Sequence, residues 1–116
     1  MRKSHWWILP VLAILVVLTL FALDERLTLR TYTGASPKLT AEVRLAVVTD
    51  FHSSDNADDV VAMVASCAPD AVLLVGDMFD DDIANRPTER TLSLLRQLSA
   101  QYTCYYVSGN HEAWTG

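Results

Sequence analysis

The hydrophobic pattern divides the chain into one long apolar run followed by several short ones. Residues 6–23 contain no charged side chain. At a rise of about 1.5 Å per residue, a helix of that length just crosses the roughly 30 Å hydrocarbon core of a bilayer. Trp6 and Trp7 lie at the charged end of the run, where aromatic side chains favour the membrane interface. The pattern predicts a single transmembrane helix whose residues 6–23 contact the lipid bilayer.

This membrane segment can be read as an uncleaved signal anchor or as a signal peptide that is removed. The run is longer than a usual signal core, and Ala22 has Leu20 two positions before it instead of a small residue, which favours the anchor. Arg2 and Lys3 precede the run, and positive charges tend to stay on the cytoplasmic side. We therefore expect a single-pass membrane protein with its anchor at residues 1–23 and the remaining residues outside the cytoplasm.

Residues 24–42 are expected to form a linker between the anchor and a folded domain. Within the linker, residues 27–33 alternate apolar and polar side chains and include β-branched ones, which predicts an exposed edge strand. The Gly-Ala-Ser-Pro sequence of residues 34–37 ends that strand. The folded domain is expected over residues 43–116.

Beyond the linker, short apolar runs alternate with amphipathic segments. Strands are expected over residues 43–49, 71–75 and 105–107. Helical spacing of apolar residues precedes Pro69 and recurs over residues 88–101. The order β-α-β-α-β predicts an α/β fold with parallel strands, because such strands need crossover connections.

Each expected strand stops at residue types that bind metals. Asp50 and His52 follow the first strand, Asp77 follows the second, and Asn110 and His111 follow the third. Parallel strands of an open α/β sheet present their carboxyl ends at one edge, so we expect these side chains to meet there. Carboxylate and imidazole groups suit borderline divalent cations, and Asp77 could bridge two of them about 3.5–4 Å apart. Such a pair polarises a phosphoryl oxygen and generates a bound hydroxide, which predicts phosphoester hydrolysis.

Plainer interpretations exist for each residue taken alone. A Gly-Asp pair after a strand often makes a turn, Asn110 could adopt a left-handed turn conformation beside Gly109, and His111 could cap the following helix. Glu112 is interpreted as a helix-start residue or as a residue that supports the metal ligands. Residue types that bind metals follow all three strand ends, and this repetition favours a common site.

Three motifs carry a resemblance to a known family. They are D-x-H at residues 50–52, G-D-x-x-D at residues 76–80 and G-N-H-E at residues 109–112, each after a hydrophobic strand. This set resembles the calcineurin-like metallophosphoesterase family. The resemblance implies a two-sheet αββα sandwich, of which the β-α-β-α-β segment at residues 43–116 would be the first half.

The resemblance also implies roles for the individual residues. Asp50 and His52 would bind one metal, Asp77 would bridge both, and Asn110 would bind the second. His111 would contact the phosphate and protonate or stabilise the leaving oxygen. The cofactors would be two divalent ions, with Mn, Fe, Zn and Co all acceptable to these ligands.

The apolar run ahead of the domain resembles the membrane-associated bacterial subgroup of this family. That implies hydrolysis of a phosphate ester or pyrophosphate bond, with a lipid-linked compound as one substrate class. The family supplies further histidines, including a later G-H-x-H, whereas this chain contains only His5, His52 and His111. We therefore expect the chain to be an N-terminal fragment, inactive by itself. The alternative is a non-catalytic, membrane-tethered module of the same fold.

The charge distribution argues against a nucleic-acid partner, and the positions of the cysteines argue against a disulfide. The segment from Leu45 to Asn85 holds nine Asp and no Lys or Arg, so it attracts cations and repels a phosphate backbone. Nucleic acid is therefore not an expected partner, although a solvated acidic face would explain part of this charge equally well. Cys67 and Cys104 lie within apolar patterns. We interpret them as small hydrophobic residues, with a disulfide pair as the less favoured alternative.

Overall fold

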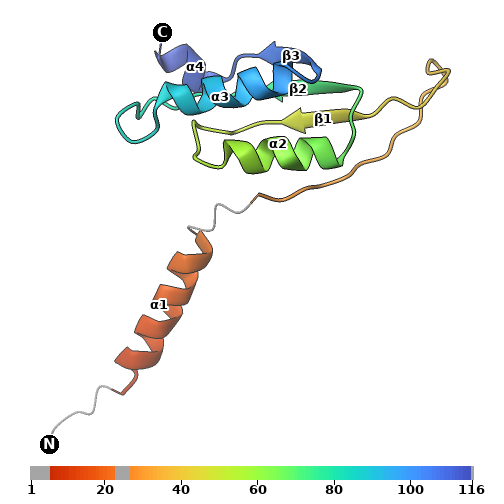
Figure 1. Cartoon of the computed structure of the whole chain (residues 1–116). Coiled ribbons are helices and arrows are strands. Elements are labelled where there is room, and N and C mark those ends of the chain that lie inside the picture. Colours follow the sequence, from red (N-terminus) through yellow and green to blue (C-terminus); the bar gives the residue numbers. More distant parts are fainter. Residues whose placement is uncertain (1–5, 23–26, 116) are drawn as a thin grey trace, which may run out of the picture.

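The computed structural model describes residues 6–22 and 27–115 (Figure 1). Its elements in chain order are α1 (Ile8–Ala22), β1 (Leu45–Val48), α2 (Ala57–Ser66), β2 (Ala71–Val75), α3 (Thr88–Ser99), β3 (Thr103–Val107) and α4 (Asn110–Thr115). Strands and helices alternate from β1 to β3, which confirms the predicted α/β class. The second strand has the predicted bounds, and the third begins at Thr103 instead of residue 105.

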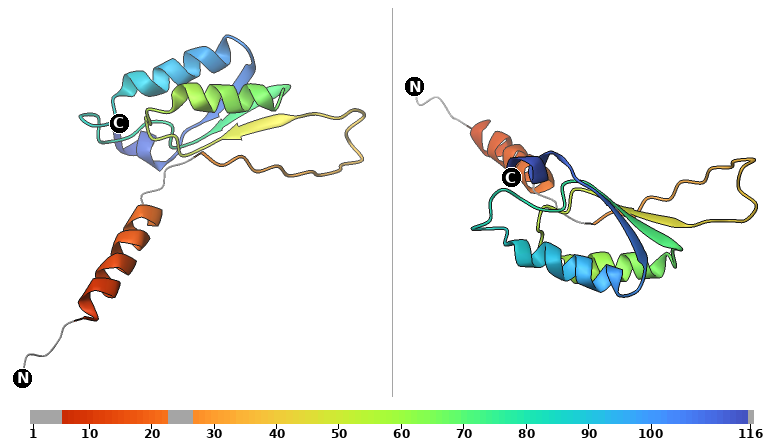
Figure 2. Two further views of the ribbon diagram at one scale, coloured as in Figure 1. Left: turned by 60° about the horizontal axis from the view of Figure 1, so that its bottom comes forward. Right: turned by 90° about the horizontal axis from the view of Figure 1, so that it is seen from above.

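The three strands form one parallel sheet in the order β1-β2-β3. Val47 of β1 lies opposite Leu73 of β2, which lies opposite Tyr105 of β3. The two crossover helices, α2 and α3, cover the same face of this sheet (Figure 2). Each strand therefore delivers its carboxyl end to the same edge.

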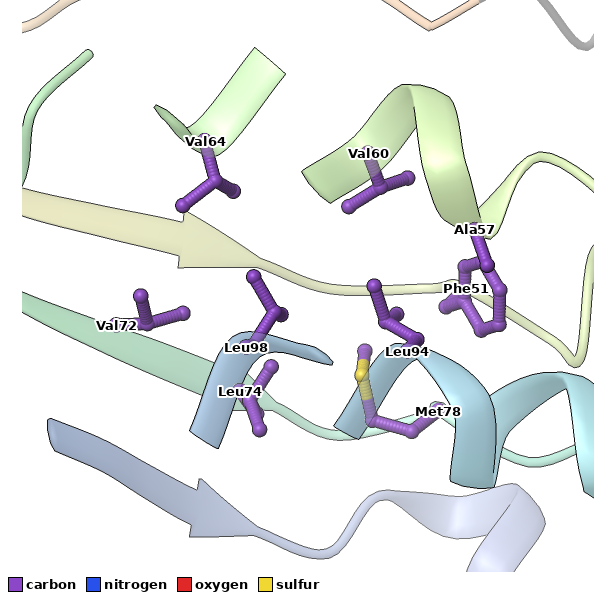
Figure 3. Packing of buried hydrophobic residues seen from close by; sticks show 9 residues of the cluster. All are labelled: Phe51, Ala57, Val60, Val64, Val72, Leu74, Met78, Leu94 and Leu98. Atoms are coloured by element: carbon purple, nitrogen blue, oxygen red, sulfur yellow. The ribbon is translucent and has the colours of Figure 1, made fainter. Parts of the chain in front are cut away.

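The hydrophobic core lies between the sheet and these two helices. Its nine buried residues come from both helices, from β2 and from the loops that follow β1 and β2 (Figure 3): Phe51, Ala57, Val60, Val64, Val72, Leu74, Met78, Leu94 and Leu98. Phe51 separates Asp50 from His52, and Met78 directly follows Asp77. Because full burial of such a side chain contributes about 1.5–3 kcal/mol, these two residues anchor the polar loops to the core.

The opposite face of the sheet is apolar and exposed. Its exposed side chains are those that alternate with the buried ones along the strands: Leu45, Val47, Val75, Tyr105 and Val107. Among the described residues, helices cover only the first face. The second sheet of the αββα sandwich that the family resemblance implies therefore stays a prediction.

The N-terminal helix differs from the sequence prediction. We expected a transmembrane helix over residues 6–23, but α1 has 15 residues, Ile8–Ala22, and position 23 lies outside the described residues. Within residues 6–22 and 27–115, no helix is both long and apolar enough to cross a membrane.

The edge strand predicted over residues 27–33 is wrong. The segment carries no strand, although it runs beside the part of the chain that contains β1. A cleft of about 1740 Å³ has residues 27–36 on one side and residues of β1 and α2 on the other. Hydrogen bonds between paired strands need neighbouring strands about 4.8 Å apart. The alternation of apolar and polar side chains does not by itself supply such a neighbour across this cleft.

Candidate metal centre

The candidate site is built by three loops at the carboxyl edge of the sheet, which follow β1, β2 and β3 (Figure 1). The first two loops continue the pairing of their strands as backbone hydrogen bonds. The N–H groups of Asp50, His52 and Ser53 donate to the carbonyls of Gly76, Asp77 and Met78, at 3.3, 3.0 and 3.0 Å. This pairing fixes the D-x-H motif against the G-D motif, although about 25 residues separate them.

The backbone of these loops adopts the left-handed region at several predicted site residues. Asp50, His52 and Asp77 have φ values of 55°, 48° and 52°, next to Gly76 at 73°. Such a conformation costs a non-glycine residue about 1–3 kcal/mol and persists only where surrounding contacts hold it. Clustering of this strain at the three strand-end residues supports a functional role for them.

The second and third loops approach each other through two glycines. A Cβ atom on Gly76 would lie 2.9 Å from Cα of Gly109, and a Cβ atom on Gly109 would collide with the Asp77 side chain. Asp77 also accepts a hydrogen bond on Oδ1 from the backbone N–H of His111, at 3.0 Å. The loops can therefore come this close only without side chains at both positions, and their contact places Asp77 at the start of α4.

Two histidines and one aspartate converge at this contact. Each of His52, Asp77 and His111 offers a potential ligand atom, and these atoms all lie within 4.8 Å of one another. The imidazole rings of His52 and His111 meet edge to face, with their centroids 4.5 Å apart. The structure thus brings together one residue from each of the three motifs.

Asp50 and Asn110, the other two predicted ligands, lie beside this group. Oδ1 of Asp50 is 3.8 Å from Nε2 of His52, and Oδ2 accepts a hydrogen bond from the Thr49 hydroxyl at 2.7 Å. Asn110 is exposed and is the first residue of α4, directly after Gly109. Their assignment as metal ligands remains a prediction.

The residues present fit a divalent cation. Two imidazoles and a carboxylate are a donor set that Mn, Fe, Co and Zn accept. The Nδ1 atom of His52 is buried and makes no hydrogen bond within the described part of the chain. A buried polar atom without a hydrogen-bond partner calls for an explanation, and a bound ion is one.

Two further aspartates, which were not among the predicted ligands, contact the histidines. Oδ2 of Asp80 is 3.6 Å from Nδ1 of His52, and Oδ1 of Asp81 is 3.3 Å from Nδ1 of His111. Arg86 brings its Nε within 3.8 Å of Asp80 and donates from its guanidinium to the His52 carbonyl at 3.2 Å. A backbone N–H from Asp82 and, more weakly, the charge of Arg86 outweigh burial and lower the pKa of Asp80. The loop after β2 therefore orients both imidazoles.

Glu112 has a larger structural role than its place at the end of the third motif indicates. Its carboxylate accepts hydrogen bonds from four backbone N–H groups, which belong to Asp77, Met78, Phe79 and Gly109. Burial favours the neutral form of Glu112, but the backbone donors outweigh burial and lower its pKa from 4.5 to about 2. Burial raises the pKa of the neighbouring Tyr106, and the negative charge of Glu112 adds to that effect. Only the fourth letter of G-N-H-E signalled this role in the sequence.

These features define an α/β domain with a candidate metal site at the carboxyl edge of a parallel sheet. Residues 43–116 match the calcineurin-like phosphoesterase family. The chain therefore belongs to that family, whose members are typically hydrolases.

Relatives with curated sequences agree with this assignment. An uncharacterized metallophosphoesterase of Campylobacter jejuni is 28% identical over 85 residues, which are 69% of this chain and 22% of the relative. One from Helicobacter pylori is 32% identical over 84 residues, covering 68% of this chain and 22% of the relative. A Bos taurus protein named a transmembrane protein with metallophosphoesterase domain is 29% identical over 84 residues, with 68% and 18% covered.

The chain thus spans about a fifth of the length of these relatives. No solved structure matches it significantly.

Proposed function

We propose that this chain supplies the first metal-binding half of a divalent-metal-dependent phosphoesterase. The observation that carries the proposal is the convergence of His52, Asp77 and His111, whose potential ligand atoms lie within 4.8 Å of one another. Each residue comes from a different strand end, and each belongs to one of the three motifs that resemble the family. Family membership supports hydrolysis as the reaction class.

We assign the metals to His52 and Asp77, with Asp50 and Asn110 completing the ligands that this chain offers. When bound, two such cations supply positive charge to the phosphoryl oxygens and an activated water molecule as the nucleophile. Asp77 presents its carboxylate where the loops after β2 and β3 meet. A hydrogen bond from the backbone N–H of His111 to Oδ1 of Asp77 holds the carboxylate there.

His111 is the residue that we assign to the leaving group. Its Nδ1 lies 3.3 Å from Oδ1 of Asp81, a contact that orients the ring. The second ring nitrogen, Nε2, would then hold the proton that passes to the leaving oxygen. Histidine is the side chain that most often transfers a proton to or from a reacting group in enzymes.

The substrate that we propose is a phosphate ester or pyrophosphate, with lipid-linked compounds as the preferred class. Support for a membrane location comes from the uncharged run over residues 6–23 and from the Bos taurus relative, which is named a transmembrane protein. We propose that residues 6–23 contact the bilayer and that the site lies outside the cytoplasm. A reporter that is active on only one side of the membrane, fused after residue 116, tests the location, and cytoplasmic activity would reverse it.

The central experiment measures hydrolysis by the full-length protein in detergent. We expect turnover of an aryl phosphate monoester or diester that chelation abolishes and that Mn²⁺ restores. Asp77→Asn should lower kcat/KM by at least roughly 10²-fold, because the amide lacks the second anionic oxygen needed to bridge two cations. Glu89→Gln, on the exposed surface of α3, is the matched control for loss of one carboxylate. Turnover that survives both chelation and Asp77→Asn would reject the proposal.

A non-catalytic, membrane-tethered module with one weakly held metal is the second candidate. It is favoured by one observation. The group of His52, Asp77 and His111 offers three ligand atoms, whereas two divalent cations need more ligand atoms than three. Metal analysis of the full-length protein separates the candidates. Two ions per protein support the enzyme, and one ion with no detectable turnover supports the module.

A further inference from the structure

The Glu112 carboxylate connects two of the three loops that build the site. Oε1 accepts hydrogen bonds from the N–H groups of Met78 and Phe79, at 2.6 and 3.2 Å. Oε2 accepts from Asp77 and Gly109, at 3.0 and 2.7 Å. Hydrogen bonds to an ionised acceptor are roughly twice as strong as neutral ones. One side chain therefore satisfies four backbone donors from two separate loops.

Three of these donors are consecutive in the chain, and the turn that aims them at Glu112 is strained. Asp77 has a φ of 52° after Gly76 at 73°. Successive backbone N–H groups in such a turn form a concave site for an anion. Without an anion there, the three N–H groups would lose their acceptor, and the left-handed conformation of Asp77 would lose one of the hydrogen bonds that hold it.

The fourth donor ties this turn to the loop after β3. Gly109 directly precedes Asn110 and His111, and a Cβ atom on Gly109 would collide with Asp77. The Glu112 side chain starts in α4 and reaches back over Gly109 to the turn after β2. Relaxation of this link would move the Asp77 carboxylate relative to His111, whose N–H it accepts at 3.0 Å.

We propose that Glu112 is a positioning residue of the metal site, which sets the position of Asp77 relative to Asn110 and His111. The inference rests on the proposed function, because positioning matters only if these residues hold metal. We assign Glu112 no contact with metal or substrate, because both of its oxygens accept hydrogen bonds from backbone N–H groups. Loss of a residue that orients metal ligands typically lowers metal affinity by roughly 10- to 100-fold.

The first test uses the metal-free, ¹⁵N-labelled full-length protein in detergent. It does not depend on enzymatic activity. In wild-type protein, we expect the amide protons of Asp77, Met78 and Gly109 to resonate downfield and to exchange slowly with solvent. Glu112→Gln should abolish this signature, because an amide presents an NH₂ group to some of the four donors. Glu112→Asp keeps both anionic oxygens on a shorter side chain and should retain part of the signature.

The second test is Mn²⁺ titration by calorimetry on the same proteins. We expect affinity to fall roughly 10- to 100-fold in Glu112→Gln, with partial recovery in Glu112→Asp and no change in Glu89→Gln. Affinity within about twofold of wild type in a folded Glu112→Gln protein would overturn the positioning role and leave the proposed function standing. If Glu112→Gln fails to fold, the same criterion applies to Glu112→Asp.

The two hypotheses fail in distinguishable ways. Wild-type protein that binds no divalent metal would overturn the proposed function and the positioning role together, whatever the amide signals show. Metal binding by wild type that is insensitive to both Glu112 variants would overturn only the positioning role. In the full-length enzyme, Glu112→Gln should lower kcat more than it raises KM, because it displaces ligands and not substrate contacts.

Discussion

The backbone N–H of His111 donates a hydrogen bond to Oδ1 of Asp77, a residue 34 positions earlier in the chain, at 3.0 Å. This bond connects the second and third motifs through one carboxylate. The carboxylate that accepts this bond on Oδ1 also carries Oδ2, and it is the carboxylate that would bridge two cations. The start of α4 therefore limits how the Asp77 carboxylate can rotate, and the geometry of the site depends on how closely these loops pack.

Gly109 permits that packing, and Gly109→Ala tests it. The added methyl group would collide with the Asp77 side chain, so the loops must separate. We expect unfolding free energy to fall by about 1–3 kcal/mol, as for other overpacked sites, and Mn²⁺ affinity to fall with it. Urea unfolding and calorimetry measure the two effects. Gly34→Ala is the matched control, since a Cβ atom there meets nothing within 4 Å.

Met78 connects the core to the site, because it is fully buried and directly follows Asp77. Met78→Ala should lower the unfolding free energy by about 2–5 kcal/mol, through lost burial and the cavity left behind. Leu39→Ala, at a position 56% exposed, should change it by less than about 0.5 kcal/mol. Equal effects of the two substitutions in urea denaturation would show that Met78 does not belong to the core.

A buried hydroxyl pair supports the first loop, and it is open to a double-mutant cycle. Thr91 of α3 donates to the Met78 carbonyl at 2.8 Å, so Ser53 must be the donor in the 2.9 Å contact between the two hydroxyls. Thr91→Val should cost about 1–3 kcal/mol, because it leaves the buried Ser53 hydroxyl without an acceptor. Combining it with Ser53→Ala should cost less than the sum of the two single changes. Additive costs would contradict the bond.

The sequence predicted the elements that position the site better than it predicted the chain before them. Apolar runs such as residues 71–75 identify buried strands because no polar side chain interrupts them. The alternation in residues 27–33 describes an extended chain but not its neighbour, and pairing depends on a neighbour. In the N-terminal run, the sequence predicted a helix over residues 6–23, and the structure has α1 at Ile8–Ala22.

Within the site, residue types in strand-end motifs predicted three side chains that meet, but not what orients them, and the ligand roles of Asp50 and Asn110 stay predictions. His52, Asp77 and His111 were foreseen because parallel strands share an edge. The contacts of Asp80 and Asp81 with the histidines depend on the path of an irregular loop, which no periodicity specifies. The four bonds to Glu112 depend on left-handed φ values that only the folded backbone reveals.

The lowered pKa of Glu112 predicts how stability depends on pH. Its folded pKa of about 2 lies below the ordinary value of 4.5, so the folded state favours the ionised form. The contribution of Glu112 is therefore complete above pH 4.5 and is lost as pH falls through 4.5 towards 2. Glu112→Gln lacks an ionisable group, so the stability difference between wild type and variant should shrink over that interval. Urea denaturation of both proteins at several pH values measures the difference, with Glu89→Gln as the control for a surface carboxylate. A difference that stays constant from pH 7 down to pH 2 would mean that the four N–H groups do not bind the ionised carboxylate.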